Sequence, residues 1–416
     1  MKKRDSILIL GPWPSIFDMA GGGTPRVLDL VNTLLAAGYD VDFVAPRPGK
    51  GDQDWFQQHT GLRIHRYRPP RFAPSGYLGR WVGWLERTIR LTTASVRVAV
   101  RHGRPRLVYA LSSLTIPAGV LSGFLLRRPT IGALFGTYLH PYLGTIRGRA
   151  SLFEEMIAFK SPVDRLLIVN DGTRGDEVAH ALGVPDSRVR FWMHGLDFEA
   201  CSAAMQSDAR SELGLPADAP IIVSASRLAE WKHVDRILRA VPAVLSAAPN
   251  TVVAISGDGP ERHALENLAR ELSVEEAVRF LGGLPRDLNL RLIASGDVFC
   301  AVYDFSCVGV ALLEALGCGV ASVVADTGAT RDFVEDGANG FVIAPDDTDE
   351  LASALIRLLS DPDLRTRLGS EARRRAEERF LTRQQRATLE LRTVAEVIAS
   401  DDGRTKRRPV TAISED

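Results

Sequence analysis

Two positive side chains follow an apolar run near the middle of the sequence. Residues 220–226 are short, apolar and rich in β-branched side chains, as in a buried parallel strand, and Arg227 and Lys232 come just after them. Open α/β sheets bind ligands at the carboxyl ends of their strands, where two cations can neutralise a diphosphate. Lys232 is one of only six lysines among 51 Lys and Arg residues, which suggests a site that needs a compact ammonium group. The alternative is a solvated pair of surface cations.

A carboxylate and a helix start form a second candidate site. Glu314 lies on a helix predicted to begin near Val308, just after a predicted strand at residues 298–302. A carboxylate there can accept hydrogen bonds from the two vicinal hydroxyls of a ribose. The free amides near Gly309 and Val310 form a helix amino terminus, which is a ready site for phosphate. The alternative is a glutamate that serves only the packing of its helix.

The first half of the chain alternates strand and helix signals. A loop of three glycines and an amphipathic helix over about residues 25–37 follow the first strand. Such alternation predicts a doubly wound parallel sheet. The predicted strands are residues 7–10, 41–45, 107–111, 129–135 and 165–169.

A second alternating series begins at residue 221 and predicts a second α/β domain. Its further strands are residues 251–256, 278–281, 298–302, 321–325 and 340–343. We therefore predict two Rossmann-like domains facing a cleft, residues 1–205 and 206–378, with a linker that begins at residue 192 and continues through a polar stretch to about residue 218. Residues 401–416 are polar and are expected to form a disordered tail.

Composition and charge limit the function classes. Hydrophobic residues make up 45% and charged residues 25%, as in an ordinary globular protein. The net charge is zero, but residues 1–200 hold 26 basic and 17 acidic side chains, so the first half is basic and the second acidic. No basic repeat interleaved with aromatics and no zinc pattern supports a nucleic-acid partner.

Cysteine spacing and hydropathy bear on the compartment. The four cysteines show no CxxC spacing, which favours a reducing cytoplasm, and the short apolar run at the start predicts a strand rather than a signal peptide. Residues 107–126 carry no charge over a length that could cross a bilayer. Their Ser, Gly and Pro residues favour a strand, a turn and a helix instead.

Several motifs in the second half occur in an order that resembles glycosyltransferase family four, whose members are retaining enzymes of the GT-B fold. The motifs are Gly257-Asp258-Gly259-Pro260 and the segments 279–285, 296–299, 306–315, 317–319, 326–332 and 336–340. The resemblance is close over about residues 221–380 and looser before them. It implies that the helix near residues 379–400 crosses back to the amino-terminal domain.

The resemblance also assigns roles to residues. It implies that Arg227, Lys232 and Glu314 are catalytic. The other donor-side candidates are Ser306, Asp304, Gly309, Val310, Gly257 and Pro285. No metal is expected, since no pair of carboxylates sits at the strand end, and no cofactor is implied because the nucleotide sugar is a substrate.

The sequence departs from the family pattern at two donor-side positions. Glu314 corresponds to the second of two glutamates eight residues apart, and Ser306 stands where the first would contact the transferred sugar. Serine can still hydrogen-bond a hydroxyl but brings no charge, and Asp304 could reach the same space. His233 replaces the glycine that usually follows the lysine. A third departure is His194 in the linker motif, where the family has asparagine.

Three residues are acceptor-side candidates. Gly22 and Gly23 belong to the glycine loop, which can lend amides to a phosphate or a sugar hydroxyl, although glycine triplets are often simple turns. His140 is the nearest match to a histidine that the family often carries, with a spacing that differs by a few residues. A loop histidine without a functional role is the alternative.

Residues 71–106, from Arg71 to Arg106, could bind an anionic membrane surface. They hold eight arginines against one acid, Glu86, and Trp81 and Trp84 lie between the arginines. A basic helix with interfacial aromatics can lie on an anionic bilayer. The alternative is a solvated helix packed on the sheet.

The sequence therefore predicts a retaining glycosyltransferase. It would move a sugar from a nucleoside-diphosphate donor to an acceptor, such as a glycan or a lipid-linked glycan intermediate. The rival of a different class is a GT-B protein without activity that binds a nucleotide sugar, or a partner glycosyltransferase in an assembly complex. Ser306 supports this rival, whereas Arg227, Lys232 and Glu314 argue against it.

Overall fold

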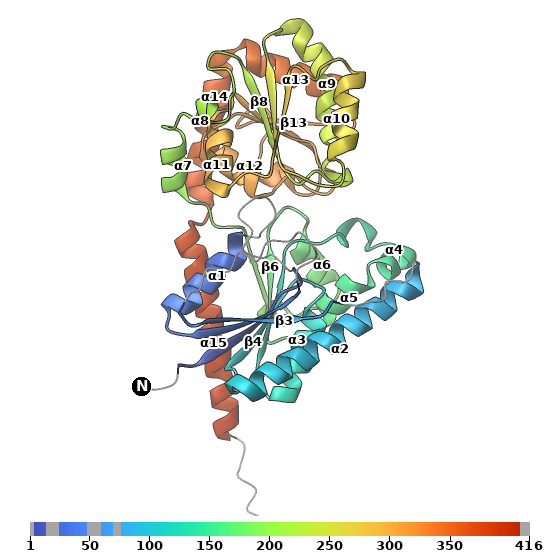
Figure 1. Ribbon diagram of the computed structural model, residues 1–416, viewed down its shortest axis with the longest axis vertical. Helices are drawn as coiled ribbons and strands as arrows, with labels where there is room; N and C mark the ends of the chain where they lie inside the picture. The colour runs from blue at the N-terminus through green and yellow to red at the C-terminus, as the bar shows by residue number, and fades with distance from the viewer. Residues whose placement is uncertain (1–3, 14–24, 48–59, 70–75, 408–416) are drawn as a thin grey trace, which may run out of the picture.

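The computed structural model describes residues 4–13, 25–47, 60–69 and 76–407, and shows two α/β domains stacked along the long axis (Figure 1). Each domain is built on a parallel sheet with helices on both faces, as the alternating sequence signals predict. The predicted pair of Rossmann-like domains is confirmed.

The amino-terminal sheet has seven strands in the order β3-β2-β1-β4-β5-β6-β7. Its strands are β1 Ser6–Leu10, β2 Asp40–Pro46, β3 Leu62–Tyr67, β4 Leu107–Leu111, β5 Thr130–Leu134, β6 Arg165–Val169 and β7 Val189–Trp192. The helices are α1 Pro25–Ala36, α2 Tyr77–His102, α3 Ile116–Leu126, α4 Ile146–Ser151, α5 Phe153–Lys160 and α6 Gly175–Ala181, with 3-10 turns at His140–Tyr142 and Asp186–Arg188.

Alternate side chains of the central strands enter two separate cores. Ile7 and Ile9 pack with α1 on one face of the sheet, whereas Leu8 and Leu10 pack with α2 and α3 on the other. Because both faces are covered, these strands are apolar throughout, which is why they can be recognised in the sequence.

The carboxy-terminal sheet has six strands in the order β10-β9-β8-β11-β12-β13. Its strands are β8 Ile221–Ala225, β9 Val252–Ser256, β10 Val278–Gly282, β11 Val298–Ala301, β12 Ser322–Ala325 and β13 Phe341–Ile343. The helices are α7 Phe198–Ala204, α8 Ala209–Glu212, α9 Val234–Ala247, α10 Arg262–Glu271, α11 Arg286–Ser295, α12 Val310–Gly317, α13 Thr348–Ser360, α14 Pro362–Arg379 and α15 Arg383–Arg407, with 3-10 turns at Glu230–Lys232 and Thr330–Asp332.

Two strands were not predicted from the sequence, and both lie at sheet edges. β3 and β7 each pair with only one neighbour, so their faces are half exposed and charged residues interrupt the apolar run. The polar stretch after residue 197 was expected to be linker, but α7 and α8 pack into the carboxy-terminal core through Cys201, Ala204 and Ala209. That core therefore begins near Leu196, ahead of the predicted boundary.

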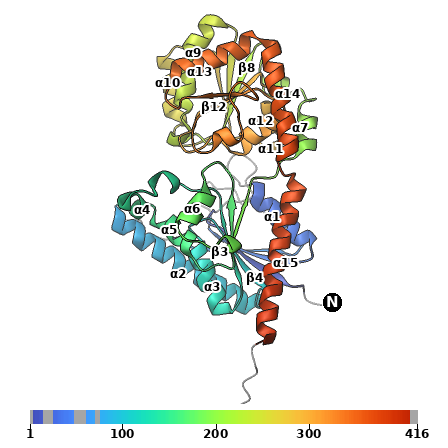
Figure 2. The same ribbon diagram turned by 180° about the vertical axis from the view of Figure 1, so that it is seen from behind.

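The last helix returns to the amino-terminal domain and runs beside α1 (Figures 1 and 2). Val394 and Val397 of α15 enter the core formed by β1 and α1. The chain breaks its helix at residues 380–382, so α14 and α15 are separate helices. The expectation of disorder from residue 401 is wrong for residues 401–407, which extend α15.

Candidate active site

Lys232 sits beyond the carboxyl end of β8, in a 3-10 turn that leads into α9. Its Nζ lies 4.1 Å from the ring centre of Trp231 and 3.6 Å from that of Tyr303. Burial lowers the pKa of Lys232 to about 8, although the neighbouring Cys307 and Asp171 oppose the shift. The ammonium group is thus held between two rings, close to an aspartate of the opposite domain.

Position 233 needs the backbone conformation that glycine adopts most easily. His233 has φ 45° and ψ 45°, in the left-handed region, which gives a physical reason for the family's glycine at this position. Its Nε2 lies 2.7 Å from Asp304 Oδ1, which also accepts a hydrogen bond of 3.1 Å from Arg236. The Asp304 carboxylate is therefore occupied by two neighbours of its own domain.

Ser306 joins the two domains. Its hydroxyl donates to the backbone oxygen of Asp171, at 2.7 Å, and accepts from the backbone amide of Val308, at 3.0 Å. A second contact follows, since the amide of Ala329 donates to the oxygen of Gly172 at 2.7 Å. Gly172 has φ 76°, and a Cβ there would lie 2.3 Å from Ser306 Oγ, so only glycine allows this approach.

Aromatic rings extend the same junction. Tyr138 of the amino-terminal domain packs edge-on against Phe305, with ring centres 4.8 Å apart, and lies 6.3 Å from Trp231. Arg227 is exposed, forms no ion pair with any described residue, and lies close enough to Tyr138 to act on the pKa of its hydroxyl. The two cations predicted from the sequence therefore face one junction, together with Ser306.

Because both hydrogen bonds of Ser306 belong to the protein, Ser306→Ala should loosen the domain junction. We expect the donor kcat/KM to fall by roughly three- to tenfold, the effect of one hydrogen bond. Affinity for a free nucleoside diphosphate should stay within about twofold. Steady-state kinetics and calorimetry on Ser306→Ala and on Ser353→Ala, a serine of α13 that bonds only within its helix, check this. An equal loss in both measurements would place Ser306 in nucleotide binding instead.

Glu314 is a buried carboxylate on the second turn of α12. It is only 3% exposed, and Arg286 Nε lies 3.7 Å from its Oε1. Burial raises the pKa of Glu314 to about 7, although Arg286 and Arg383 oppose the shift. A carboxylate that is costly to ionise, with one arginine as its only ion-pair partner among the described residues, can accept hydroxyl hydrogen bonds from a ligand.

The other donor-side candidates divide by role. Gly309 caps α12, and the space where its Cβ would lie is open, so a ligand can approach the first amides of the helix. Gly257 has φ 133°, and a Cβ there would lie 1.8 Å from the oxygen of Ser226, so this glycine keeps the ends of β8 and β9 together. Pro285 precedes the first residue of α11.

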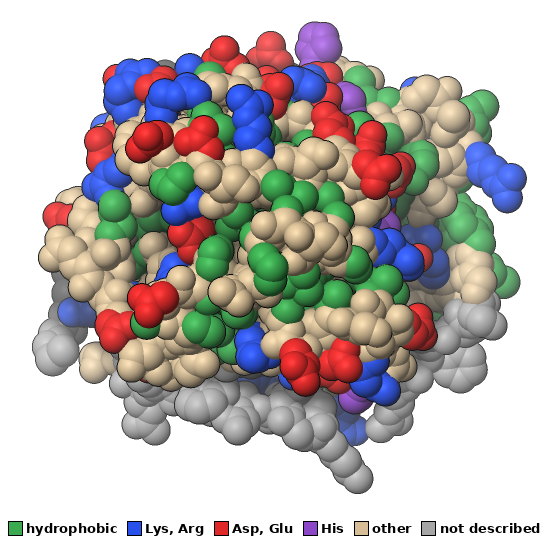
Figure 3. All heavy atoms as spheres, turned by 90° about the horizontal axis from the view of Figure 1, so that it is seen from above, with side chains coloured by type: hydrophobic (Ala, Val, Ile, Leu, Met, Phe, Trp, Pro, Cys, Tyr) green, Lys and Arg blue, Asp and Glu red, His purple; other side chains and the backbone are tan. Residues whose placement is uncertain are grey.

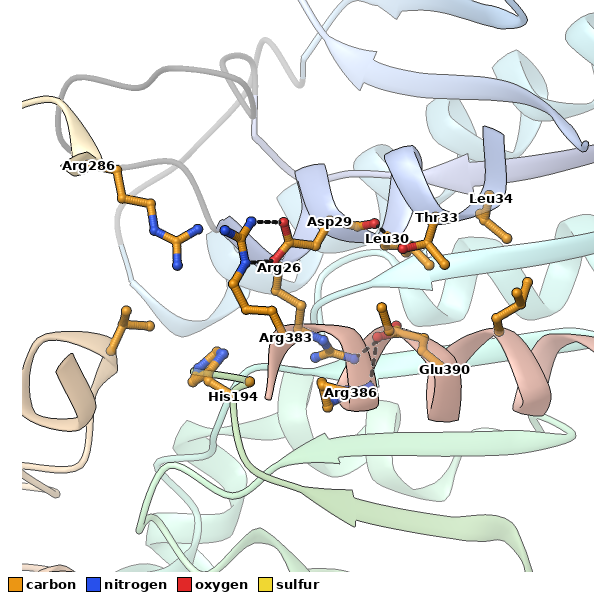
Figure 4. Close-up of a pocket in the computed structure, with 14 residues that line it drawn as sticks. Arg26, Asp29, Leu30, Thr33, Leu34, His194, Arg286, Arg383, Arg386 and Glu390 are labelled. Carbon is orange, nitrogen blue, oxygen red and sulfur yellow. Dashed lines mark hydrogen bonds and ion pairs between the residues drawn. The ribbon is translucent and has the colours of Figure 1, made fainter. Parts of the chain in front are cut away.

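A pocket lies between the domains where α1, α15, the linker and α12 meet (Figure 4). Val310 and Arg286 reach it from the carboxy-terminal domain, and His194 reaches it from the linker. Burial lowers the pKa of His194 to about 3, and Arg26, Arg386 and Arg286 add to the shift. The imidazole is therefore neutral at physiological pH.

A buried charged cluster forms one wall of this pocket. Glu390 of α15 accepts hydrogen bonds from Arg26 at 3.2 Å, from Arg386 at 2.9 Å and from Tyr109. Arg26, Arg386 and Glu390 are each less than a tenth exposed. One carboxylate thus holds the last helix to α1 and β4.

Of the three acceptor-side candidates, the structure describes only His140. Gly22 and Gly23 lie outside the described residues, as does Arg71. His140 lies in a 3-10 turn and pairs with Glu177 of α6 at 3.0 Å. The sequence reasoning missed Asp171, Tyr138, Arg286 and the Glu390 cluster. Their only sequence signal is a charged or aromatic residue just after a strand or on a helix.

The expected membrane anchors on α2 are wrong in their orientation. Trp81 stacks on Phe153 of α5, with ring centres 3.9 Å apart, and Trp84 packs against the same ring. Other apolar side chains of α2 are exposed, among them Leu78 at 77% and Leu85 at 52%. No described helix combines the length and apolar run that crossing a bilayer requires.

Two sequence profiles match the chain, one in each domain. The profile described as "Glycosyl transferase 4-like domain" matches residues 21–192, and the profile described as "Glycosyl transferases group 1" matches residues 205–375.

No group of three or more possible metal ligands comes together in the part of the chain that the structure describes.

Individual relatives are similar over different shares of the chain. A GDP-mannose-dependent alpha-(1-6)-phosphatidylinositol monomannoside mannosyltransferase of Mycolicibacterium smegmatis is 34% identical over 43% of this chain and 49% of its own length. This chain thus spans about half the length of that relative. An uncharacterized glycosyltransferase of Methanocaldococcus jannaschii is 27% identical over 87% of this chain and 91% of its own. The structure of sucrose-phosphate synthase from Thermosynechococcus elongatus superposes with a TM-score of 0.76 at 20% identity, covering 95% of this chain and 100% of that one, which shows the fold.

Proposed function

This chain belongs to the glycosyl transferases of group 1, and we propose that it moves a sugar from a nucleoside-diphosphate donor to an acceptor with retention of configuration. The observation that carries the proposal is the position of Lys232, whose ammonium group lies between two rings at the domain junction. A half-buried cation at a strand end is suited to a diphosphate.

The proposed mechanism is mainly electrostatic. The leaving diphosphate gains negative charge as the glycosidic bond breaks, and Arg227, Lys232 and the first amides of α12 would meet that charge in a preorganised site. Glu314 would hold the ribose hydroxyls, and the sugar would point toward Ser306 and the Asp171 side of the cleft. Since this scheme places all the countercharge on the protein, we expect turnover to persist in EDTA.

A donor screen tests the proposal directly. Thermal-shift measurements with nucleoside diphosphates and their sugars should identify a stabilising ligand, because a ligand at about 100 times its Kd adds roughly 2.7 kcal/mol to stability. The best donor is then incubated with acceptors, and the anomeric configuration of the product is read by NMR. Donor binding without hydrolysis or transfer would support the non-catalytic alternative.

The pKa values of Glu314 and Lys232 predict a bell-shaped pH dependence of donor binding. Below a pKa of about 7, Glu314 takes up a proton and loses its negative charge, which makes it a weaker acceptor of hydroxyl hydrogen bonds, so affinity falls toward acid pH. Above a pKa of about 8, Lys232 loses its charge, so affinity falls toward alkaline pH. Affinity should therefore be highest between about pH 7 and pH 8.

Calorimetry with a nucleotide sugar across pH 5.5–9.5 measures this profile, because its diphosphate has no terminal phosphate that titrates near pH 6. Glu314→Gln should weaken binding at pH 8 and remove the acid limb while keeping the alkaline one. Glu335→Gln, a change to an exposed carboxylate that pairs with Arg375, is the matched control and should leave both limbs in place. An unchanged acid limb in Glu314→Gln would assign that limb to another group.

We further propose that the acceptor is a lipid-linked glycan intermediate used at a membrane surface. The basic first half of the chain, the exposed apolar residues of α2, and the phosphatidylinositol acceptor in the name of the Mycolicibacterium relative support this. Leu78→Ser with Leu85→Ser should reduce co-sedimentation with anionic vesicles severalfold, whereas Trp81→Phe, which keeps an aromatic ring beside Phe153, should not. Recovery in the supernatant with every vesicle type would point to a soluble acceptor.

A further inference from the structure

A groove runs between the edge strand β3 and helix α2, on the side of the amino-terminal domain away from α15. None of the described residues that line it is acidic. Its six arginines are Arg47, Arg66, Arg68, Arg90, Arg97 and Arg101. The face of the molecule seen from above, by contrast, mixes acidic, basic and apolar side chains (Figure 3).

Four of these arginines have no ion-pair partner among the residues that the structure describes. Arg90 pairs with Glu86 at 2.5 Å, within α2. Arg47, Arg68, Arg97 and Arg101 are exposed and form no ion pair with any described residue. The nearby carboxylate of Asp42 is already bound by other groups, since it accepts from Arg63 Nε at 2.8 Å and lies 2.9 Å from His65 Nε2. Arg47, Arg68, Arg97 and Arg101 are therefore available to an anion.

The groove has walls of two kinds. On one side are Arg66 of β3 and two arginines that directly follow β2 and β3, namely Arg47 and Arg68. On the other side, successive turns of α2 supply Arg97 and Arg101, four residues apart on one helix face. A guanidinium group can bind two oxygens of a phosphate or of a carboxylate, but a phosphate offers more oxygens and more charge, so it can satisfy several arginines at once. Arginines converging from two walls thus favour a phosphate or diphosphate group.

An apolar surface continues from the groove along α2. Ile89 lines the groove and is 55% exposed, and the exposed side chains of Leu85, Val82 and Leu78 follow it toward the start of the helix. Their spacing of three or four residues places them on one stripe. A molecule that carries phosphate at one end and hydrocarbon at the other would contact both features.

We propose that this groove binds the phosphate or diphosphate group of a lipid, whose hydrocarbon part lies along the apolar stripe of α2. The inference deepens the proposed function by giving the acceptor or its surrounding bilayer a phosphate site. It rests on the proposed function only for the claim that the phosphate belongs to a lipid, because the arginines by themselves account for phosphate binding.

The test uses the full chain with Arg227→Ala and Lys232→Ala, so that the proposed donor site does not bind the probe. Calorimetry with inorganic pyrophosphate should show saturable binding. Arg97→Gln with Arg101→Gln should raise its Kd about tenfold or more, since charge-assisted hydrogen bonds to phosphate are lost. Arg97→Lys with Arg101→Lys should retain part of the affinity, because the charge remains. Arg147→Gln with Arg367→Gln, two exposed arginines outside the groove, is the matched control.

Vesicles identify the source of the phosphate. Co-sedimentation with phosphatidylglycerol vesicles should fall at least fivefold in Arg97→Gln with Arg101→Gln, and phosphatidylcholine vesicles should bind little of any variant. The proposal would be overturned if the protein failed to bind pyrophosphate or failed to bind anionic vesicles. Equal binding by the groove variant and its control would also overturn it. Tighter binding to an oligonucleotide than to vesicles, lost in the same variant, would overturn the lipid assignment. Nucleotide-sugar binding by the wild-type chain is measured separately, so a failed donor site and a failed groove give different results.

Discussion

Lys232→Ala is expected to lower turnover by about a hundredfold or more, the scale of losing one group that stabilises charge in the transition state. The ammonium group lies between Trp231 and Tyr303, and no other lysine occurs between residues 161 and 405 to replace it. The loss should appear mainly in kcat, because the leaving diphosphate carries more charge in the transition state than in the bound donor.

Lys232→Arg should also be impaired, because a planar guanidinium group does not reproduce the compact charge that the ammonium group places between the two rings. Arg227→Ala should resemble Lys232→Ala. Lys160→Ala, a change to an exposed lysine at the end of α5, is the matched control and should keep wild-type rates. Steady-state kinetics with the best donor decide this, and wild-type turnover in Lys232→Ala would remove the diphosphate assignment.

Glu390→Gln should destabilise the protein by about 3–5 kcal/mol, the usual effect of leaving buried charges without their partner. Arg26 and Arg386 both depend on this carboxylate, and both have further guanidinium nitrogens that find no partner among the described residues. Because α15 lies against α1 and β1, the loss should loosen the last helix from the amino-terminal domain.

Differential scanning calorimetry should show a lower unfolding temperature for Glu390→Gln, and hydrogen exchange should show faster exchange in α15. Glu396→Gln is the matched control on the same helix, since its pair with Arg190 is partly exposed and spans 3.8 Å, and it should change stability by less than about 1 kcal/mol. Replacing Arg26, Arg386 and Glu390 together by apolar residues should recover part of the stability. Equal stability of Glu390→Gln and the wild type would show that the cluster is not the main attachment of α15.

Local pattern determined much of the fold. Buried parallel strands such as β4 and β8 are apolar throughout because helices cover both faces, so a short run of sequence identifies them. Edge strands escape this rule, and β3 was missed because arginine and histidine alternate with its apolar residues. The break between α14 and α15 was also missed, although the path of the last helix back to α1 follows from the family resemblance.

The placement of the donor-side candidates could be expected from the sequence, because they follow strand ends in one domain. Fewer than 90 residues of sequence contain Arg227, Lys232 and Glu314, and all three follow strands of the same sheet. Parallel topology brings the carboxyl ends of these strands to one edge. Their environments were not predictable. The burial that brings the pKa of Lys232 to about 8 and that of Glu314 to about 7 comes from rings and helices elsewhere in the chain.

Only the tertiary structure determined which contacts join distant parts of the chain. Ser306 was interpreted from the sequence as a neutral substitute for a sugar-binding carboxylate, whereas its hydroxyl joins the backbone of Asp171, 135 residues away. The Glu390 cluster unites residues 364 positions apart, and the arginine groove combines a strand edge with a helix. Such contacts depend on how separately folded elements pack, and pairing over this distance leaves no periodic signal in the sequence.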